Sequence, residues 1–208
     1  ITMIMLIAMI TMLIDHIGAV FFPEQEWLRL IGRIAFPLYA FGIVQGYRYT
    51  RNLKKYFFRL AGLAVISQIP YVLLFQVQQL NVIFLFVVAL LSLYLVDQYK
   101  KKYSVPFVIC LALIVSPFIE YGVYGIALVF IYRYFEGKNI LLGHILLSGI
   151  YLLLFQEAFY IQYCAIAASA LILFKDKLLS YPIQLNRHLY RAFYPVHLAI
   201  LALVGVFV

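Results

Sequence analysis

Residues 1–14 read ITMIMLIAMITMLI, and after Asp15 and His16 the apolar run resumes as IGAVFF to Phe22. About 20 predominantly apolar residues are what a helix needs to cross a bilayer. The stretch therefore predicts a membrane span that carries two ionisable side chains toward one of its ends. Because an ionisable group costs about 2.5–3.5 kcal/mol at a helix centre on insertion scales, we expect the pair to be retained for polar partners or for chemistry.

The rest of the chain is as apolar as its beginning. Hydrophobic residues make up 66% of the 208 residues and charged residues only 12%, which is too little polar surface for a soluble globule. The first run lacks a basic start and a small-residue cleavage site, so we interpret it as a retained span. We expect an all-α fold, a polytopic integral membrane helical bundle with about nine transmembrane segments, in a single domain over residues 1–208. The segments are 2–22, 28–47, 56–75, 81–96, 103–118, 121–134, 140–155, 158–174 and 189–208.

The basic residues predict the orientation of the bundle. All but two of the 16 lysines and arginines fall in alternate connections, and such residues stay on the cytoplasmic side. This sorting puts the N-terminus inside and His16 near the outer face. The exceptions, Arg29 and Arg33, share the outer side with Asp15, Glu24, Glu26, Glu120 and Glu157. The net charge of +8 is thus a topology signal, and we expect membrane lipids rather than nucleic acid as surroundings.

His16 and Asp15 are the first candidates for chemistry. His16 lies about six residues, or about 9 Å, inside the expected outer end of its span, where burial favours a neutral imidazole that can act as a general base. The alternative is a histidine that only hydrogen-bonds a neighbouring helix. Adjacent helical residues point about 100° apart, so we expect Asp15 to pair elsewhere, with Arg33, unless Arg33 reaches the lipid head groups instead. Pro37 is expected to bend the second span near this site.

Two further regions are candidates for binding. His197 lies near the middle of the last span, just after Pro195, where it can line a cavity, bind the middle of a cofactor, or bond a carbonyl that the proline frees. The turn after the second span gathers cations that can hold phosphates or serve only as topology determinants; these are Arg48, Arg51, Lys54, Lys55 and Arg59.

The missing motifs narrow the reaction classes. The sequence has no HExxH, GxSxG or P-loop pattern and no cysteine–histidine cluster, so we expect no metal site, serine hydrolysis or nucleotide hydrolysis. A base near the outer face and a phosphate-binding inner face suit group transfer across the membrane. A proton-coupled transporter, with His16 and His197 as relay groups, and a non-enzymatic assembly factor remain alternatives.

Six strings carry a family resemblance that extends from about residue 3 to residue 201. They are IDHIGAVFFP, RLIGRIAFPLYAFGIVQGYRYTRNLKKYFFRL, ISQIPY, LNVIF, EYGVYG and FYPVHL. In this order and spacing they resemble the TraX family of F-pilin acetylase-like proteins, itself similar to a wider group of membrane acyltransferases that includes acyltransferase-3 proteins and heparan N-acetyltransferase. The resemblance implies an acyl-CoA-dependent O- or N-acyltransferase in a bacterial cytoplasmic (inner) membrane.

The resemblance also implies roles for particular residues. It marks His16 as the catalytic histidine and Arg33 as a site residue, with Asp15 holding Arg33, and with Arg33, Asn81 or Tyr121 stabilising the oxyanion. Acetyl-CoA is the expected donor, its phosphates on Arg48, Arg51, Lys54, Lys55 and Arg59 and its pantetheine arm passing His197. The expected acceptor at the outer face is a pilin N-terminus, a glycan, a lipid or a small amine.

Overall fold

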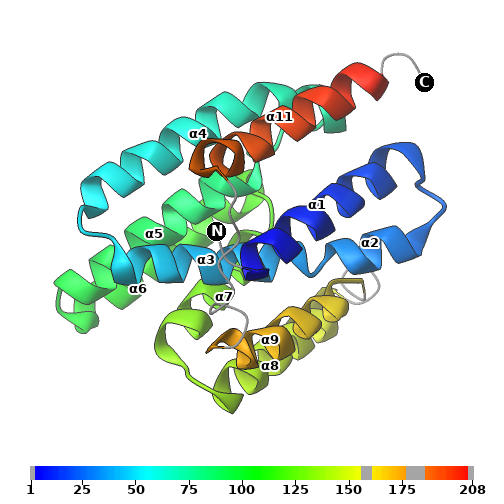
Figure 1. The fold of residues 1–208 in the computed structure, drawn as a ribbon. Coiled ribbons are helices and arrows are strands. Elements are labelled where there is room, and N and C mark those ends of the chain that lie inside the picture. Colours follow the sequence, from blue (N-terminus) through cyan, green and yellow to red (C-terminus); the bar gives the residue numbers. More distant parts are fainter. Residues whose placement is uncertain (1–2, 156–160, 177–185, 206–208) are drawn as a thin grey trace.

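The computed structural model describes residues 3–155, 161–176 and 186–205, and the regular elements within them are helices. An isolated bridge joins Leu80 to Ile119. Figure 1 shows the bundle, and the expected all-α class is confirmed. The elements are α1 (Met3–Phe21), α2 (Glu26–Gly32), α3 (Ala35–Tyr49), α4 (Leu53–Phe75), α5 (Val82–Gln98), α6 (Lys101–Val115), η1 (Ser116–Phe118), α7 (Gly122–Tyr134), α8 (Lys138–Phe155), η3 (Ile161–Ala165), α9 (Ile166–Leu173) and α11 (Arg187–Gly205).

Within the described residues, five helical stretches are long and apolar enough to cross a membrane, which supports a polytopic membrane protein. They are Met3–Phe21, Glu26–Tyr49, Leu53–Phe75, Lys101–Phe118 and Lys138–Phe155, and three apolar helices are shorter. The expected total of nine crossings stays a prediction. Glu157, the first residues of the segment 158–174, and positions 177–185 and 206–208 lie outside the described residues.

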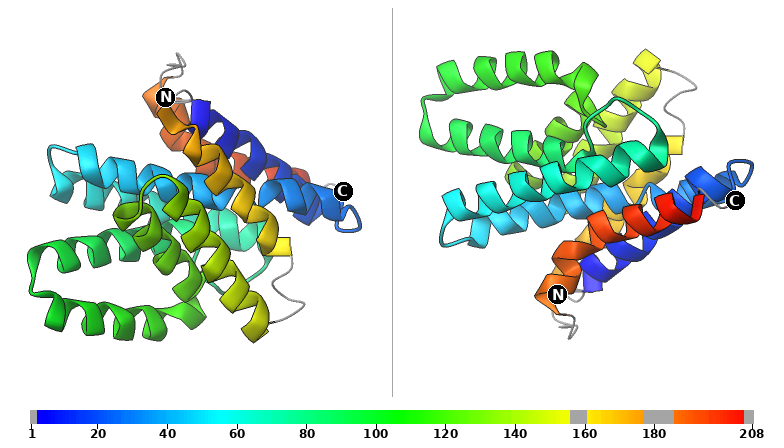
Figure 2. Two further views of the ribbon diagram at one scale, coloured as in Figure 1. Left: turned by 90° about the horizontal axis from the view of Figure 1, so that it is seen from below. Right: turned by 90° about the horizontal axis from the view of Figure 1, so that it is seen from above.

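The helices form layers that Figure 2 shows from two sides. In both views α6 lies at one edge, α1 and α11 lie toward the opposite edge, and α3 and α4 pass between them. Helices α3, α5 and α7 supply most of the main buried core. Helix α6 instead exposes large apolar side chains, among them Phe107, Ile109 and Ile114. Exposed apolar surface of this kind fits contact with lipid.

Hydrogen bonds hold both ends of the bundle, through side chains at one end and through the backbone at the other. At one end, the Asp97 carboxylate accepts hydrogen bonds from Tyr47 (2.9 Å), Arg133 (2.9 Å) and Tyr134 (2.7 Å), which joins the last turns of α3, α5 and α7. At the other end, the backbone of Leu80 pairs with that of Phe118 and Glu120. The first end carries the basic connections, so the charge sorting predicts that it is the cytoplasmic end.

The second apolar stretch, Glu26–Tyr49, is a bent helix rather than a straight one. Helix α2 ends at Gly32 and α3 begins at Ala35, and because Arg33 and Ile34 between them keep right-handed helical backbone angles, Arg33 lies at a bend. Pro37 follows four residues after Arg33, and because proline has no N–H it cannot bond the Arg33 carbonyl as a continuous helix would require. The interruption between α2 and α3 agrees with the bend expected from Pro37. A bend of this kind is tolerated in a span where neighbouring groups satisfy the freed backbone.

Helices α1 and α11 lie side by side and run in the same direction (Figure 1). The Tyr190 hydroxyl is 3.4 Å from the Met5 sulfur, and further along both helices His16 reaches His197. Because the second contact lies further along both helices than the first, the two helices run in parallel. The first and last helices of the fold therefore bring two histidines together, although 181 positions separate them.

Candidate active site

Asp15 and His16 face different helices, as expected from their adjacent positions. The Asp15 carboxylate contacts arginines of the second span, whereas the His16 ring packs against α4 and α11. Its ring centroid is 5.1 Å from that of Phe75 and 6.4 Å from that of Tyr194. One helix thus contributes to two polar clusters, which we call the ion cluster and the histidine pair.

The histidine pair joins α1 to α11. His16 Nδ1 lies 2.8 Å from His197 Nε2, with the rings stacked at 5.0 Å and 12°. His197 is 5% exposed, and its Nδ1 lies 2.7 Å from the backbone oxygen of Phe193. Sequence reasoning considered that His197 bonds a carbonyl freed by Pro195. That carbonyl belongs to Arg191, four residues earlier, so the structure assigns His197 a different partner.

The ion cluster contains the expected Asp15–Arg33 contact and a closer one. Arg29 Nη1 donates to Asp15 Oδ2 at 2.8 Å, and Arg33 Nη2 lies 3.6 Å from Asp15 Oδ1. Arg29 and Arg33 are four residues apart and so lie on one side of the chain, a spacing that sequence reasoning left unused. Gly32 permits the approach, because a Cβ at this position would collide with the Asp15 side chain.

Arg33 and Tyr121, both expected near an oxyanion, come together at the bend between α2 and α3. Arg33 Nη1 lies 3.4 Å from the Tyr121 hydroxyl oxygen, and Arg33 Nε is buried without a partner among the described residues. Tyr121 adopts φ +63° and stacks on Phe36 at 3.9 Å. A left-handed aromatic residue is uncommon and is often found where function fixes the backbone.

Asn81, the third expected oxyanion residue, is fully engaged in the fold. Its side-chain nitrogen donates to Ala64 O (2.9 Å) and Gln68 Oε1 (2.8 Å), while its oxygen caps α5 by accepting from the Ile83 N–H (3.0 Å). An amide nitrogen has two hydrogens, so none remains for a substrate. We therefore reassign Asn81 to anchoring α4 against α5.

Glu120 is the acidic group of this region that sequence reasoning noted only as a weak signal. It lies between η1 and α7, next to Tyr121, and its carboxylate accepts a hydrogen bond from the Tyr71 hydroxyl. Burial raises the pKa of Glu120 to about 7, and the nearby Arg33 opposes that rise. The hydroxyl of Tyr194 lies within electrostatic reach of Glu120, so this carboxyl borders the aromatic surroundings of the histidine pair.

A cavity of about 390 Å³ lies between α1, α3, α4, α5 and α11, and we call it the central cavity. Sequence reasoning expected Arg59 in a binding role, and Arg59 lines this cavity together with Arg191, which was assigned only to topology. Apart from these arginines, the walls carry no charged side chain. The lining residues are Met12, Tyr39, Gly42, Ile43, Tyr56, Phe58, Arg59, Leu60, Gly62, Leu63, Ile66, Val82, Ile83, Phe86, Tyr190, Arg191, Phe193 and Tyr194.

The other expected phosphate-binding residues take different positions. Lys54 and Lys55 line an open groove with Arg59 at the start of α4. Arg51 is exposed in the preceding turn. Arg48 donates to the backbone oxygen of Arg133 at 2.6 Å and so ties α3 to α7. The structure thus brings Lys54, Lys55 and Arg59 together and separates Arg48 from them.

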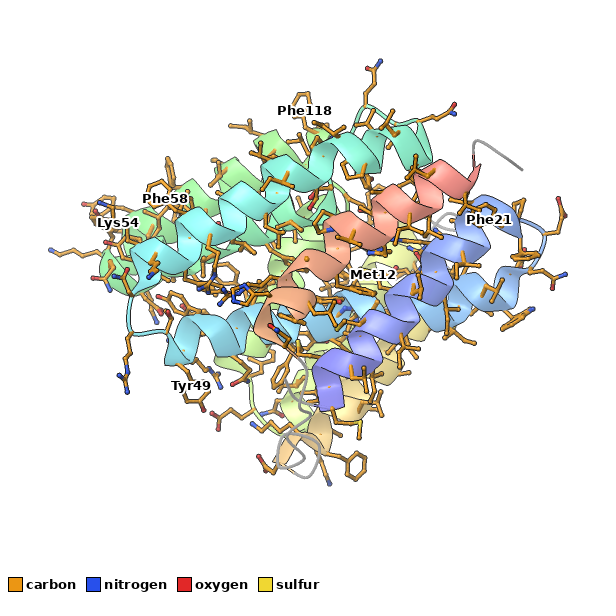
Figure 3. The ribbon with its side chains drawn as sticks, turned by 45° about the horizontal axis from the view of Figure 1, so that its top comes forward. Met12, Phe21, Tyr49, Lys54, Phe58 and Phe118 are labelled. Carbon is orange, nitrogen blue, oxygen red and sulfur yellow. The ribbon has the colours of Figure 1, made fainter. Side chains whose placement is uncertain are left out.

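The central cavity approaches the histidine pair from the end of the bundle that carries the α3–α4 turn. Met12 precedes His16 by one helical turn on α1, and Phe193 precedes His197 by one turn on α11; both line the cavity. Four helical residues span about 6 Å. Figure 3 shows Lys54 and Phe58 near the α3–α4 turn, Phe21 at the opposite end, and Met12 between them. The cavity therefore leads from Arg59 and Arg191 toward the two histidines.

The family model described as TraX protein matches residues 2–205. The chain belongs to the TraX family. It is also 29% identical to a protein of Dichelobacter nodosus named "Probable fimbrial assembly protein FimC, serogroup H1", over 94% of this chain and 91% of that protein. Protein TraX of Escherichia coli is 38% identical over 40% of this chain and 34% of that protein's length. No solved structure matches. The ion cluster, the histidine pair and the central cavity all lie within the TraX match.

Glu120 makes the stability of this TraX-family protein depend on pH. Its pKa is higher in the folded protein than the usual 4.5, so the folded state holds this proton more tightly, and the stabilisation is lost as pH rises from about 4.5 to about 7. We expect Glu120→Gln to remove that loss, so that the variant gains several degrees in melting temperature over the parent at pH 8 but not at pH 5. Thermal melts at both pH values measure the difference. Exposed Glu136 gives a matched control, Glu136→Gln, and equal pH dependence in parent and Glu120→Gln would contradict the assignment.

Proposed function

We propose that this protein is a membrane acyltransferase that moves an acetyl or related acyl group from cytoplasmic acyl-CoA to an amine or hydroxyl at the outer face. The observation that carries the proposal is the central cavity, which begins beside Arg59 and Arg191 and ends one helical turn from His16 and His197. An apolar passage between a cationic mouth and a buried histidine suits a donor with a phosphate-bearing head and a slender acylated arm.

Cations at the cytoplasmic end hold the head of the donor in this proposal. Lys54 and Lys55 face the groove beside Arg59, and Arg191 faces the central cavity. Arginine forks and lysine ammonium groups both bind phosphate oxygens. At about 390 Å³ the cavity falls in the range of small-molecule sites, roughly 300–1,000 Å³, and it suits the pantetheine arm rather than the nucleotide, which stays among the cations.

His16 is the general base. Its Nε2 takes the proton of the acceptor amine or hydroxyl, whose nitrogen or oxygen then bonds the thioester carbonyl carbon. Arg33 and Tyr121 stabilise the negative charge that forms on the carbonyl oxygen, since Arg33 has an unpaired N–H and a positioned donor acts where charge develops. When the carbon–sulfur bond breaks, His16 returns the proton to the departing sulfur. The products are the acylated acceptor and free coenzyme A.

The relatives favour an acceptor connected with pili. The Dichelobacter relative is named for fimbrial assembly, and the match covers nearly the whole length of both chains. A pilin N-terminal amine is therefore our first choice of acceptor, ahead of a glycan, a lipid or a small amine. We place the protein in the cytoplasmic membrane of a bacterium, with the acceptor on the outer side.

Donor binding and transfer test the proposal directly. Acetyl-CoA should raise the melting temperature of the purified protein, coenzyme A should do so to a smaller or equal extent, and ATP should have little effect. Labelled acetyl groups should then reach an amine acceptor. Absence of both stabilisation and transfer with the intact protein in lipid nanodiscs would overturn the acyltransferase assignment.

Reversing the charges at the cavity mouth is expected to weaken donor binding. Arg59→Glu and Arg191→Glu should each raise the KM for acetyl-CoA by about 10-fold or more and change kcat less, because each replaces attraction to a phosphate by repulsion. Steady-state kinetics at varied donor concentration measure both constants. Lys102→Glu is the control, since Lys102 is also a cytoplasmic cation but lies against Tyr103. An unchanged donor KM in both arginine variants would return these residues to a topology role.

A proton-coupled transporter is the second candidate, and the histidine pair is the observation that favours it. Two hydrogen-bonded imidazoles within a bundle are groups from which proton relays are built. The two functions separate in liposomes. A transporter moves its substrate with a pH dependence and without coenzyme A, whereas the acyltransferase requires the acyl donor.

A further inference from the structure

The backbone oxygen of Phe193 sets the direction of both hydrogen bonds in the histidine pair. A carbonyl oxygen only accepts, so His197 Nδ1, 2.7 Å away, carries a hydrogen. In a neutral His197 the other nitrogen, Nε2, is then an acceptor. His16 Nδ1, 2.8 Å from that Nε2, must donate to it. The hydrogen of a neutral His16 therefore lies on Nδ1, and its Nε2 keeps a lone pair.

The surroundings favour two neutral rings. His16 packs against Phe75 of α4 and Tyr194 of α11, and His197 stacks on Phe193 at 4.6 Å and 16°. Arg29 and Arg33, the charged side chains that act on His16, are cations and oppose further positive charge. The nearby carboxylate, Asp15, is occupied by those two arginines. Among the described residues, no carboxylate pairs with either histidine to compensate a second proton.

We propose that His197 is a positioning residue that holds His16 in the tautomer with its hydrogen on Nδ1 and so leaves Nε2 as the basic nitrogen. Its effect on catalysis rests on the proposed acyltransferase function, whereas the tautomer itself does not. The sequence-based expectation placed His197 on the pantetheine arm. The hydrogen bonds instead occupy both of its ring nitrogens, one with His16 and one with Phe193, which leaves no polar atom of the ring for a donor molecule.

The hydrogen bond between His16 and His197 also stabilises the protonated state of His16. When Nε2 takes a proton from the acceptor, His16 becomes an imidazolium, and its Nδ1–H still donates to His197 Nε2. The bond becomes charge-assisted and hence shorter and stronger. Because His197 is neutral, it stabilises the His16 imidazolium without a permanently charged anion being buried beside it. His16 Nε2 has no hydrogen-bond partner of its own among the described residues, as a base that awaits a substrate requires.

Nitrogen NMR of histidine-labelled protein in nanodiscs tests the tautomer without any enzymatic assay. The His16 signals are assigned by their loss in His16→Gln. In the parent we expect a protonated Nδ1 and a bare Nε2 for His16. In His197→Phe the preference of His16 for the Nδ1–H tautomer should disappear. In His197→Gln that preference should persist, because the amide oxygen of the glutamine can accept a hydrogen bond from His16 Nδ1. A parent His16 protonated at Nε2, or an unchanged tautomer in His197→Phe, would overturn the proposal.

Kinetics then test the role in the reaction. We expect His197→Phe to lower kcat about 10- to 100-fold at an unchanged donor KM and His197→Gln to recover most of the loss. Melting temperatures show whether each variant is folded. A raised donor KM with unchanged kcat would overturn the positioning role and return His197 to donor binding. If the parent transfers no acyl group at all, the proposed function fails, while the NMR result still decides the hydrogen-bond direction.

Discussion

His16→Ala is expected to reduce acyl transfer by about 10²- to 10⁴-fold, because a positioned general base contributes that much to a proton transfer. The loss should appear in kcat, with little change in the donor KM, since the donor's head is held at the other end of the central cavity. Transfer of labelled acetyl from acetyl-CoA to an amine acceptor measures it. Stabilisation by acetyl-CoA should persist, which shows that the variant is folded and still binds its donor.

A second histidine variant shows whether the loss of transfer is specific to His16 or follows from removing any histidine. His188 lies in the first turn of the same helix that carries His197, but it is exposed. His188→Ala should therefore keep parental transfer rates. Transfer that continues at the parental rate in His16→Ala would remove His16 from the mechanism and favour the assembly-factor alternative.

Much of the fold could be predicted because a bilayer imposes simple rules on sequence. Apolar segment lengths and alternating basic connections anticipated the all-α class and the long apolar helices, among them α6, which together with η1 is long enough to span, and the shorter α7. The bend at Arg33 was expected from Pro37. A proline shows that a helix is perturbed, but the group that packs at the bend, here Tyr121, depends on the arrangement of the other helices.

The directions in which side chains point from a single helix could be predicted, whereas the contacts between helices could be predicted less well. The 100° separation of neighbouring residues correctly sent Asp15 and His16 to different partners. Sequence alone did not favour Arg29 over Arg33 as the closer partner of Asp15, because that choice depends on the angle at which α2 crosses α1. The same limit applied to His16 and His197, which meet only because the first and last helices run in parallel.

Asn81 and Arg191 illustrate opposite errors. Asn81 was expected near the oxyanion because burying a polar residue in a span is energetically unfavourable. Its hydrogen bonds to Ala64 and Gln68 offset that unfavourable burial without any role in the reaction. Arg191 was assigned only to topology because it lies among other cytoplasmic cations, yet α11 brings it to the central cavity. In both cases the residue type was informative, and the role depended on three-dimensional neighbours.

Asp15→Leu is expected to cost about 2–3 kcal/mol of stability, because it leaves Arg29 and Arg33 without their shared carboxylate. Removing one partner of a buried ion pair costs roughly 3–5 kcal/mol, and Arg29 is 28% exposed, so solvent lowers the figure here. Melting temperature or denaturant midpoint in detergent measures the change. Acyl transfer should fall as well, since Arg33 loses the group that holds its guanidinium beside Tyr121.

A double variant distinguishes the loss of an ion pair from the loss of packing. In Asp15→Leu/Arg29→Met the cation closest to the missing carboxylate is also gone, so part of the stability should return. Transfer should not return with it, because Arg33 is still without Asp15. Asp176→Leu is the control, since Asp176 is exposed and should change neither property. A double variant as unstable as Asp15→Leu would mean that packing against Gly32, rather than charge, determines the contribution of Asp15 to the fold.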